Sequence, residues 1–338
     1  MNQNTMARTI IETFINKFFR DMETDPDRSI RNMIDIGINF AKGRFQKEFF
    51  EALQEMLQNE QSAYYDLVKN LVQYTSHKRL RTFGMNLGFQ ACTLGANTIR
   101  ENEEKWNFNI PWAYYLTLGS AGLPGPYVEQ IISQGKGLGT YVYLLAGTGE
   151  ITEEHTALLK NHPDCAFVLL VSPAEILSDL PDFLEEIPNC LILLENSSNL
   201  LAEAADALRE QGFLYGVYET FSAKTQEKLW NTGHLEQICE VKAPLYVLMP
   251  RQRFSFEENE ALREWTAEIR GRQEYPFIVF DFISDVQTID RIISNDSCAV
   301  AFDSDGCVYT DTGKWQGTSY NIREKSLFEI LEKVTKKR

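Results

Sequence analysis

The sequence predicts an α/β protein with a full or partial (β/α) barrel, an N-terminal helical region, and a C-terminal β-hairpin followed by a helix. In residues 1–105, apolar residues recur at helical spacing. From residue 106 onward, short apolar runs alternate with helical patterns, which is typical of parallel strands covered on both faces. Near the end of the chain, Asp305 and Gly306 lie between two alternating runs and predict a hairpin turn.

The N-terminal region, residues 1–105, is expected to form several successive helices. Asp25 and Pro26 separate the first two, because Asp caps a helix and Pro suits the first turn of the next one. The last helical pattern of the region contains small residues that predict close packing against another element: Gly84, Gly88, Ala91 and Cys92.

The barrel region is expected to cover residues 106–295. Its predicted strands are IPWAYYLTL, TYVYLLA, AFVLLV, CLILLE, FLYGVYE, PLYVLM and FIVFDF, and helical patterns separate them. Six or seven such strand–helix units suit a barrel better than an open sheet. Residues 296–338 are expected to form a separate extension, which contains the hairpin CAVAFDSDGCVYTD and an amphipathic helix in IREKSLFEILEKV.

Composition and charge limit the functions that the chain can have. The chain has 338 residues, of which 43% are hydrophobic and 24% are charged, so a sizeable core is expected. Its net charge of −15 disfavours a nucleic-acid partner, because phosphate binding needs a positive surface. There is no apolar run long enough to span a membrane, and the N-terminal sequence lacks the pattern of a signal peptide. We therefore expect a cytoplasmic protein with no membrane association.

The cysteines and histidines give no metal-binding pattern. No two cysteines have a spacing typical of a metal site, and no two histidines share a metal-ligand spacing. Widely spaced cysteines suggest reduced intracellular thiols and not a disulfide framework. The six cysteines are Cys92, Cys165, Cys190, Cys239, Cys298 and Cys307.

The predicted ligand-binding residues lie where strands of the barrel end, because the carboxyl ends of barrel strands converge on one mouth. A glycine turn after the second predicted strand could offer backbone amides to an anionic or nucleotide-like group. Carboxylates and a guanidinium after later strands could hold a polar ligand. The alternative for each residue is a solvated side chain, a helix cap or a tight turn. The candidates are Gly147, Thr148, Gly149, Glu150, Glu195, Glu219, Arg251 and Asp281.

The order of these segments resembles the radical S-adenosylmethionine (SAM) superfamily, and most of all an uncharacterised bacterial branch with an N-terminal helical region and a C-terminal extension. The resemblance covers roughly residues 78–332. It rests on an entry strand like NIPWAYYLTL, a helix like YVEQIISQGKGLG, a strand like TYVYLLAG, a fourth strand like LILLEN and a closing segment like NIREKSLFEIL. It implies a radical-SAM-type barrel.

The chain departs from the superfamily where the cluster would bind. Active members hold a [4Fe–4S] cluster with three thiolates from a CxxxCxxC-type loop. The corresponding loop here, GSAGLPGP at 119–126, has no cysteine. Gly147-Thr148-Gly149-Glu150 occupies the place of the family's Gly-Gly-Glu-Pro motif, and Glu195 matches a family glutamate after the fourth strand. The resemblance therefore implies a degenerate member with no cluster, for which SAM or a related nucleoside remains a candidate ligand.

The sequence thus predicts a radical-SAM-like pseudoenzyme that acts as a non-catalytic ligand- or partner-binding module. One alternative is a cluster-independent enzyme that positions its substrate with polar residues at the barrel mouth, such as Glu195, Glu219 and Arg251. Another alternative is a structural partner of an intact radical SAM homologue. The expected partner is accordingly either a small polar ligand or such a homologue.

Overall fold

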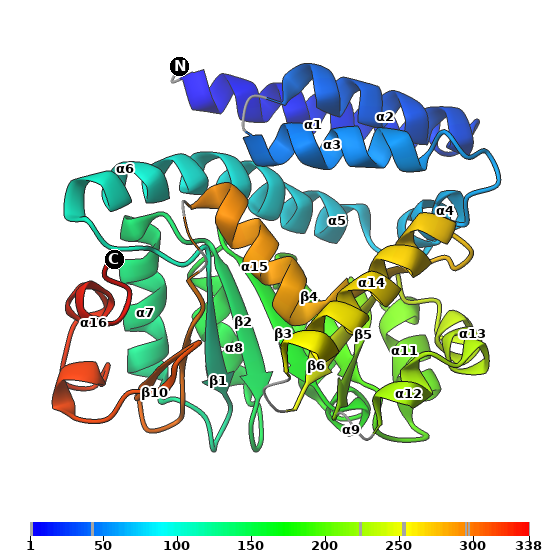
Figure 1. Ribbon diagram of the computed structural model, residues 1–338. Helices are drawn as coiled ribbons and strands as arrows, with labels where there is room; N and C mark the ends of the chain where they lie inside the picture. Colours follow the sequence, from blue (N-terminus) through cyan, green and yellow to red (C-terminus); the bar gives the residue numbers. More distant parts are fainter. Residues whose placement is uncertain are drawn as a thin grey trace. The chain divides into compact units, whose positions relative to one another are not determined.

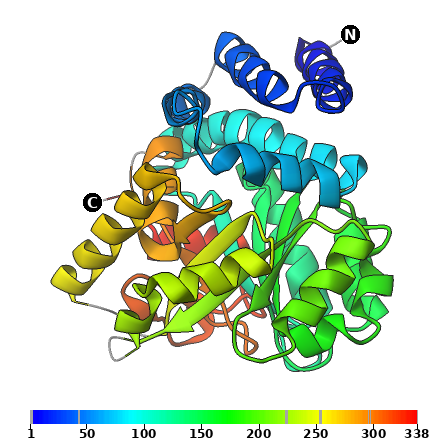
Figure 2. The same cartoon turned by 90° about the vertical axis from the view of Figure 1, so that its right-hand side faces the viewer.

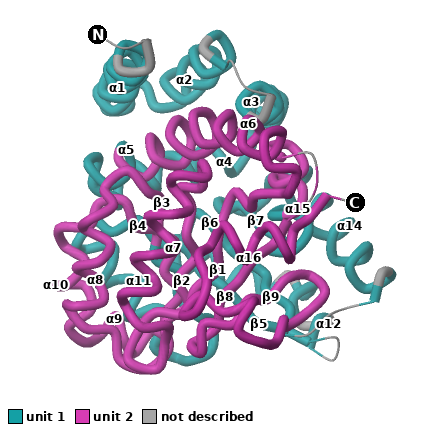
Figure 3. The backbone as a smooth tube through the Cα atoms, turned by 90° about the vertical axis from the view of Figure 1, so that its left-hand side faces the viewer, with its two compact units in different colours: residues 1–81, 192–286 teal, residues 82–191, 287–338 magenta. Residues whose placement is uncertain are grey.

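The computed structural model describes residues 3–41, 44–222, 225–251, 255–294, 296 and 298–337. The chain forms two compact units, which Figure 3 colours separately. Unit 1 contains residues 1–81 and 192–286, and unit 2 contains residues 82–191 and 287–338. The three-part division at residues 105 and 295 remains a prediction.

Unit 1 begins with the predicted N-terminal helices, of which α1, α2 and α3 run alongside one another (Figure 1 and Figure 2). Asp25 caps α2, since its side chain accepts a hydrogen bond from the Arg28 amide, and Pro26 is the first helical residue, as predicted. The apolar faces of these helices form a core around Ile30, Ile34 and Leu67. The helices are α1 (Gln3–Asp21), α2 (Pro26–Phe40), α3 (Arg44–Met56), α4 (Tyr64–Tyr74) and the first part of α5 (His77–Gly84).

The rest of unit 1 consists of parallel strands joined by helices. The strands lie in sequential order: β4 (Cys190–Glu195), which belongs to unit 1 from Ile192 onward, β5 (Tyr215–Phe221), β6 (Leu245–Pro250) and β7 (Ile278–Asp281). Each lies within or beside an apolar run that predicted a strand. The helices are α11 (Leu201–Glu210), α12 (Gln226–Leu229), α13 (Thr232–Glu240), α14 (Phe256–Arg272) and the start of α15 (Phe282–Ile293).

Unit 2 has the same strand–helix alternation and adds the C-terminal hairpin. Its strand order is β10-β9-β8-β1-β2-β3, with β8, β1, β2 and β3 parallel and β9 antiparallel to β8. The strands are β1 (Ala113–Leu118), β2 (Val142–Gly147), β3 (Ala166–Val171), β8 (Val300–Phe302), β9 (Val308–Thr310) and β10 (Gly313–Lys314). β8 and β9 pair antiparallel on either side of Gly306, which has φ +82°, so the Asp-Gly hairpin is confirmed.

The helices of unit 2 begin with a π-helix, η1 (Met85–Gly95), which continues into α6 (Ala96–Trp106). The others are α7 (Gly125–Leu138), α8 (Glu153–Lys160), α9 (Pro173–Ile176), α10 (Leu180–Leu184), the 3₁₀ turn η2 (Thr318–Tyr320) and α16 (Leu327–Val334). Parallel strands in sequential order, β1 to β3 in unit 2 and β4 to β7 in unit 1, alternate with helices, which is the repeat of a (β/α) barrel. The predicted fold class is therefore confirmed. Among the described helices, none has the length and hydropathy needed to cross a bilayer.

The predicted close packing in the last N-terminal helical stretch occurs at a different residue. A Cβ added at Gly84 or Gly88 would meet no atom within 4 Å, so the prediction was wrong for these two positions. The close approach lies between Gly95 and Gly139, where a Cβ on Gly95 would lie 2.4 Å from the Gly139 carbonyl oxygen. Gly139 also ends α7 with φ +107°, a conformation that L side chains rarely adopt.

We expect Gly139→Ala to lower the free energy of unfolding by about 2 kcal/mol or more, because the new Cβ would combine backbone strain with a clash against Gly95. Gly137→Ala is the matched control. It lies in the same helix with open space at its Cβ, and it should stabilise the protein by about 0.5–1 kcal/mol. Urea unfolding measures both. Equal effects of the two substitutions would contradict the close approach.

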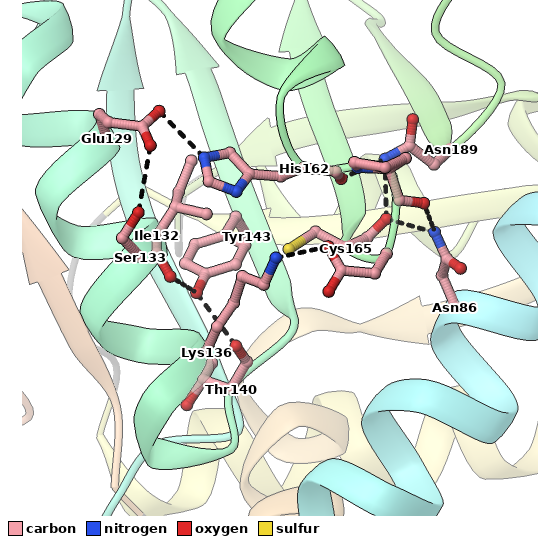
Figure 4. A network of polar contacts seen from close by, with 12 residues as sticks. Asn86, Glu129, Ile132, Ser133, Lys136, Thr140, Tyr143, His162, Cys165 and Asn189 are labelled. Carbon is pink, nitrogen blue, oxygen red and sulfur yellow. Dashed lines mark hydrogen bonds and ion pairs between the residues drawn. The ribbon is translucent and has the colours of Figure 1, made fainter. Parts of the chain in front are cut away.

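A polar network ties the amino ends of β2 and β3 to neighbouring segments of unit 2 (Figure 4). The Cys165 carbonyl oxygen accepts hydrogen bonds from the side-chain amides of Asn86 (2.7 Å) and Asn189 (2.9 Å). Tyr143 Oη lies 3.0 Å from the Thr140 carbonyl oxygen, and His162 Nε2 lies 3.0 Å from a Glu129 carboxylate oxygen. Because these groups lie at the amino ends of the strands and mostly contact backbone, we interpret the network as structural.

Two buried carboxylates lie near the amino ends of β1 and β8. Glu103 accepts hydrogen bonds from the Ile110 amide (2.8 Å) and from Ser294 Oγ (2.6 Å). Asp290 accepts one from the Cys298 amide (2.8 Å), while its Oδ1 has no hydrogen-bond partner. Burial raises the pKa of Asp290 to about 7, although the amides of Cys298 and Trp112 lower it. Asp290 is thus protonated in mildly acidic solution only because the protein is folded.

We expect the contribution of Asp290 to the free energy of unfolding to fall as pH rises from about 4 to about 7. Folded Asp290 keeps its proton over this range, whereas the unfolded chain, with a pKa near 3.8, has lost it. The slope that this group contributes is at most about 1.4 kcal/mol per pH unit. Asp290→Asn should flatten the pH dependence, as measured by urea unfolding at several pH values. An unchanged slope in Asp290→Asn would contradict the assignment.

Candidate functional site

In unit 2, the turns that follow β1 and β2 are hydrogen-bonded to each other. The Thr148 amide donates to the Leu118 carbonyl (2.8 Å), and the Ala121 amide donates to the Thr148 carbonyl (3.0 Å). The Ser120 amide donates to the Glu150 carbonyl (2.8 Å), and the Glu150 amide donates to Ser120 Oγ (2.9 Å). We call this arrangement, residues 118–123 together with 148–150, the closed turn pair.

Two glycines allow the closed turn pair to form. Gly119 has φ +121°, and a Cβ there would lie 2.4 Å from the Thr148 carbonyl oxygen. A Cβ on Gly149 would lie 2.5 Å from Ser120 Oγ. The first turn is also bonded within itself, since the Gly122 amide donates to the Gly119 carbonyl at 2.8 Å. These glycines therefore allow backbone to approach backbone.

The structure thus brings together four of the predicted ligand residues, Gly147, Thr148, Gly149 and Glu150. The amides of Thr148 and Glu150, which the predicted anion cradle would have offered, already donate within the closed turn pair. Glu150 is exposed to solvent. A ligand role for these four residues remains a prediction.

The residues of the first turn do not fit a [4Fe–4S] cluster. Such a cluster needs thiolate ligands, and residues 119–125 are Gly, Ser, Ala, Gly, Leu, Pro and Gly. Of the six cysteines, four are buried. Burial raises the pKa of the Cys92 thiol to about 12 and also raises that of Cys165, so both are neutral thiols. Within the described ranges, no three His, Cys, Asp or Glu residues are grouped so that they could hold a metal ion.

In unit 1, Glu219 of β5 is the centre of a half-buried polar cluster. One of its carboxylate oxygens, Oε2, lies 2.8 Å from His234 Nε2, and accepts hydrogen bonds from Tyr246 Oη (2.7 Å) and Asn196 Nδ2 (2.8 Å). Burial alone would raise the pKa of Glu219, but the hydrogen bonds from His234, Tyr246 and Asn196 outweigh it and lower this pKa. Burial, and the nearby Glu219 carboxylate, raise the pKa of Tyr246. Glu219 is therefore ionised at neutral pH.

The strand register separates Glu195 from Glu219. Val217 pairs with Tyr246 and Glu219 pairs with Leu248, so Glu219 and Tyr246 point to the same face, where His234 of α13 lies. Glu195 pairs with Tyr218, the neighbour of Glu219 along β5. Since successive side chains of a strand point to opposite faces, Glu195 and Glu219 face opposite sides of the sheet.

The other two predicted residues of unit 1 also have separate surroundings. Arg251 is exposed, and its Nε donates to Thr220 Oγ1 at 2.8 Å. Asp281 is buried at the end of β7, and its amide donates to Asp285 Oδ2 at 2.9 Å. Glu195 accepts a hydrogen bond from Ser197 Oγ at 3.0 Å. Their role in ligand binding remains a prediction.

Sequence reasoning missed the partners of Glu219. Tyr246 lies inside the apolar run PLYVLM, which predicted a strand and no polar role, and His234 is one of four histidines without a metal-ligand spacing. The sequence contained one signal of this cluster: Asn196 directly follows Glu195, so two polar residues stand together at the end of β4.

Comparison with known proteins gives matches only among solved structures. No protein-family model matches the chain, and no curated protein does. The crystal structure of Streptococcus suis SuiB bound to S-adenosylmethionine matches with a TM-score of 0.49 and 12% identity, over 69% of this chain and 66% of that chain, slightly less than two thirds of its length. SuiB bound to its precursor peptide SuiA matches with a TM-score of 0.48. Native anSMEcpe with bound AdoMet matches with a TM-score of 0.41 and 11% identity, over 64% of this chain and 80% of that chain. SuiB and anSMEcpe are radical SAM enzymes, the superfamily that the sequence resembles.

We expect Glu219→Ala to lower the free energy of unfolding by about 2–4 kcal/mol, because it would leave three buried or half-buried polar groups without their partner. Glu195→Ala is the matched control, since it removes a strand-end carboxylate with one hydroxyl partner, and its effect should be within about 0.5 kcal/mol. Urea unfolding compares the two.

The pH dependence of the free energy of unfolding provides a further test of Glu219→Ala and Glu195→Ala. Because folding lowers the pKa of Glu219, its contribution is complete above about pH 4.5 and is lost as pH falls further. The difference between the two variants should therefore shrink in acid. If the unfolding free energies of the two variants differ little at neutral pH, or differ more in acid, the assigned role of Glu219 in the cluster is contradicted.

Proposed function

We propose that this chain is a radical-SAM-like protein that does not assemble a [4Fe–4S] cluster and acts as a non-catalytic module that binds a small polar ligand or a protein partner. The observation that carries the proposal is the closed turn pair. The turn after β1, where the resembling superfamily has its three cluster cysteines, contains no thiol and donates its amides to the turn after β2.

The closed turn pair opposes cluster binding in two ways. Thiolate ligands are what hold an iron–sulfur cluster, and no side chain of residues 119–125 can replace them. A loop that wrapped a cluster would also have to release the amides of Ser120 and Ala121 from their carbonyl partners. S-adenosylmethionine or a related nucleoside remains a candidate ligand of the proposed module, without cluster chemistry.

The two alternative functions gain less support. The enzyme alternative requires Glu195, Glu219 and Arg251 to position one substrate, but Glu195 and Glu219 lie on opposite faces of the sheet. The structural-partner alternative would be favoured by a continuous apolar patch on the N-terminal helices. Met6 and Ile10 of α1 and Phe49 of α3 are exposed, and the Phe49 ring also packs against the ring of Phe50 in the same helix.

Anaerobic reconstitution with ferrous iron and sulfide tests the proposed function. We expect no stoichiometric cluster, measured by charge-transfer absorbance, EPR of the reduced sample and iron and sulfide content, and no cleavage of added S-adenosylmethionine. Cys307→Ser, which alters one of the partly exposed thiols, is the control for adventitious iron and should bind as little as wild type. A stoichiometric, EPR-active cluster that cleaves S-adenosylmethionine would refute the proposal.

A further inference from the structure

The helices at the start of unit 1 form an apolar cavity of about 170 Å³ that is partly open to solvent. Side chains from α1 to α4 and from β7 line it, among them Phe18, Ile34, Phe50, Leu53 and Val68. One polar side chain among its walls, Tyr64, directs its hydroxyl to the Arg270 carbonyl oxygen at 3.3 Å. The cavity therefore offers a ligand almost no hydrogen-bonding group.

The size of the cavity favours an apolar occupant. Protein interiors are normally packed so closely that voids larger than a water molecule are few. A dry cavity of about 150 Å³ lined by aliphatic and aromatic side chains binds benzene or xenon. The cavity of unit 1 is of the same size and lining chemistry, so it suits an alkyl or aryl group of about six to eight carbon atoms.

A polar hollow of about 260 Å³ shares two wall residues with the cavity, Ile34 and Leu57. Its other walls are Arg31, Asp35, Gln54, Gln58 and Glu60. The apolar cavity and the polar hollow therefore adjoin at Ile34 and Leu57, so hydrogen-bonding side chains lie next to the apolar lining.

The charged side chains of the polar hollow determine which head group of a bound amphiphile it would accept. Arg31 donates to Tyr65 Oη at 3.2 Å, and Gln54 donates to Asp35 Oδ1 at 2.9 Å. The walls carry two carboxylates, Asp35 and Glu60, against one guanidinium. This balance disfavours a carboxylate or phosphate head group and leaves a neutral group that can exchange hydrogen bonds.

We propose that the apolar cavity and the polar hollow of unit 1 together bind one small neutral amphiphile, with its alkyl chain in the cavity and a hydroxyl or amide head group in the hollow. The site lies in unit 1, whereas the closed turn pair lies in unit 2. The inference is therefore independent of the proposed absence of a cluster.

Thermal unfolding of the full chain with n-heptanol tests the proposal. We expect a saturable rise in Tm for wild type, because a ligand that binds only the folded state stabilises it. Short-chain n-propanol at the same concentration should give no such rise, and n-heptanoate should bind at least tenfold more weakly than n-heptanol. No saturable rise with n-heptanol, or binding of n-heptanoate that equals it, would overturn the proposal.

Variants on α3 locate the binding. Leu53→Phe, which fills the apolar cavity, should abolish the rise in Tm. Phe49→Leu, at an exposed position of the same helix, is the matched control and should keep it. A rise that survives Leu53→Phe would contradict the assigned site.

Methyl NMR of wild type keeps the test decisive if Leu53→Phe does not fold. On addition of n-heptanol, the methyl signals of Ile34 and Val68 should shift, and that of Ile131, buried in unit 2, should not. Unchanged Ile34 and Val68 signals at saturating alcohol would overturn the proposal.

Discussion

The backbone hydrogen bonds that join the turns after β1 and β2 are the constraint on which the functional interpretation depends. They bring residues 119–121 and 148–150 so close that a Cβ at either Gly119 or Gly149 would clash with the opposite turn. The same bonds use the amides of Ser120, Ala121, Thr148 and Glu150. Gly119 and Gly149 therefore have a packing role, because a residue with a Cβ would not fit this close approach.

The alternation of side chains along a strand limits the second candidate region. Residues at the ends of β4, β5 and β6 lie near the same edge of their sheet, but adjacent positions face opposite sides. Glu219 faces α13, and its Oε2 contacts His234 of α13, Tyr246 of β6 and Asn196, which follows β4. This ionised cluster holds a helix on its strand, whereas Glu195 and Arg251 contact other hydroxyl groups.

The sequence allowed prediction of features that depend on local chemistry. The cap at Asp25, the hairpin at Gly306 and the succession of strands and helices follow from propensity and periodicity, and all are present. The bond between Ser120 and Glu150 joins residues 30 positions apart, and no local pattern encodes it. The pairing of Glu219 with His234 and the contact of Gly95 with Gly139 are likewise set by tertiary packing. The position of a residue along its strand could be predicted from the sequence. The face of the sheet that its side chain occupies, and the residues that it contacts, could not.

Amide hydrogen exchange of the closed turn pair tests the central claim most directly. If the two turns are bonded as described, the amides of Ala121, Thr148 and Glu150 exchange slowly, and ferrous iron with sulfide does not alter their exchange. Rapid exchange of these amides in the protein alone, or a large change in their protection when iron and sulfide are added, would contradict the account.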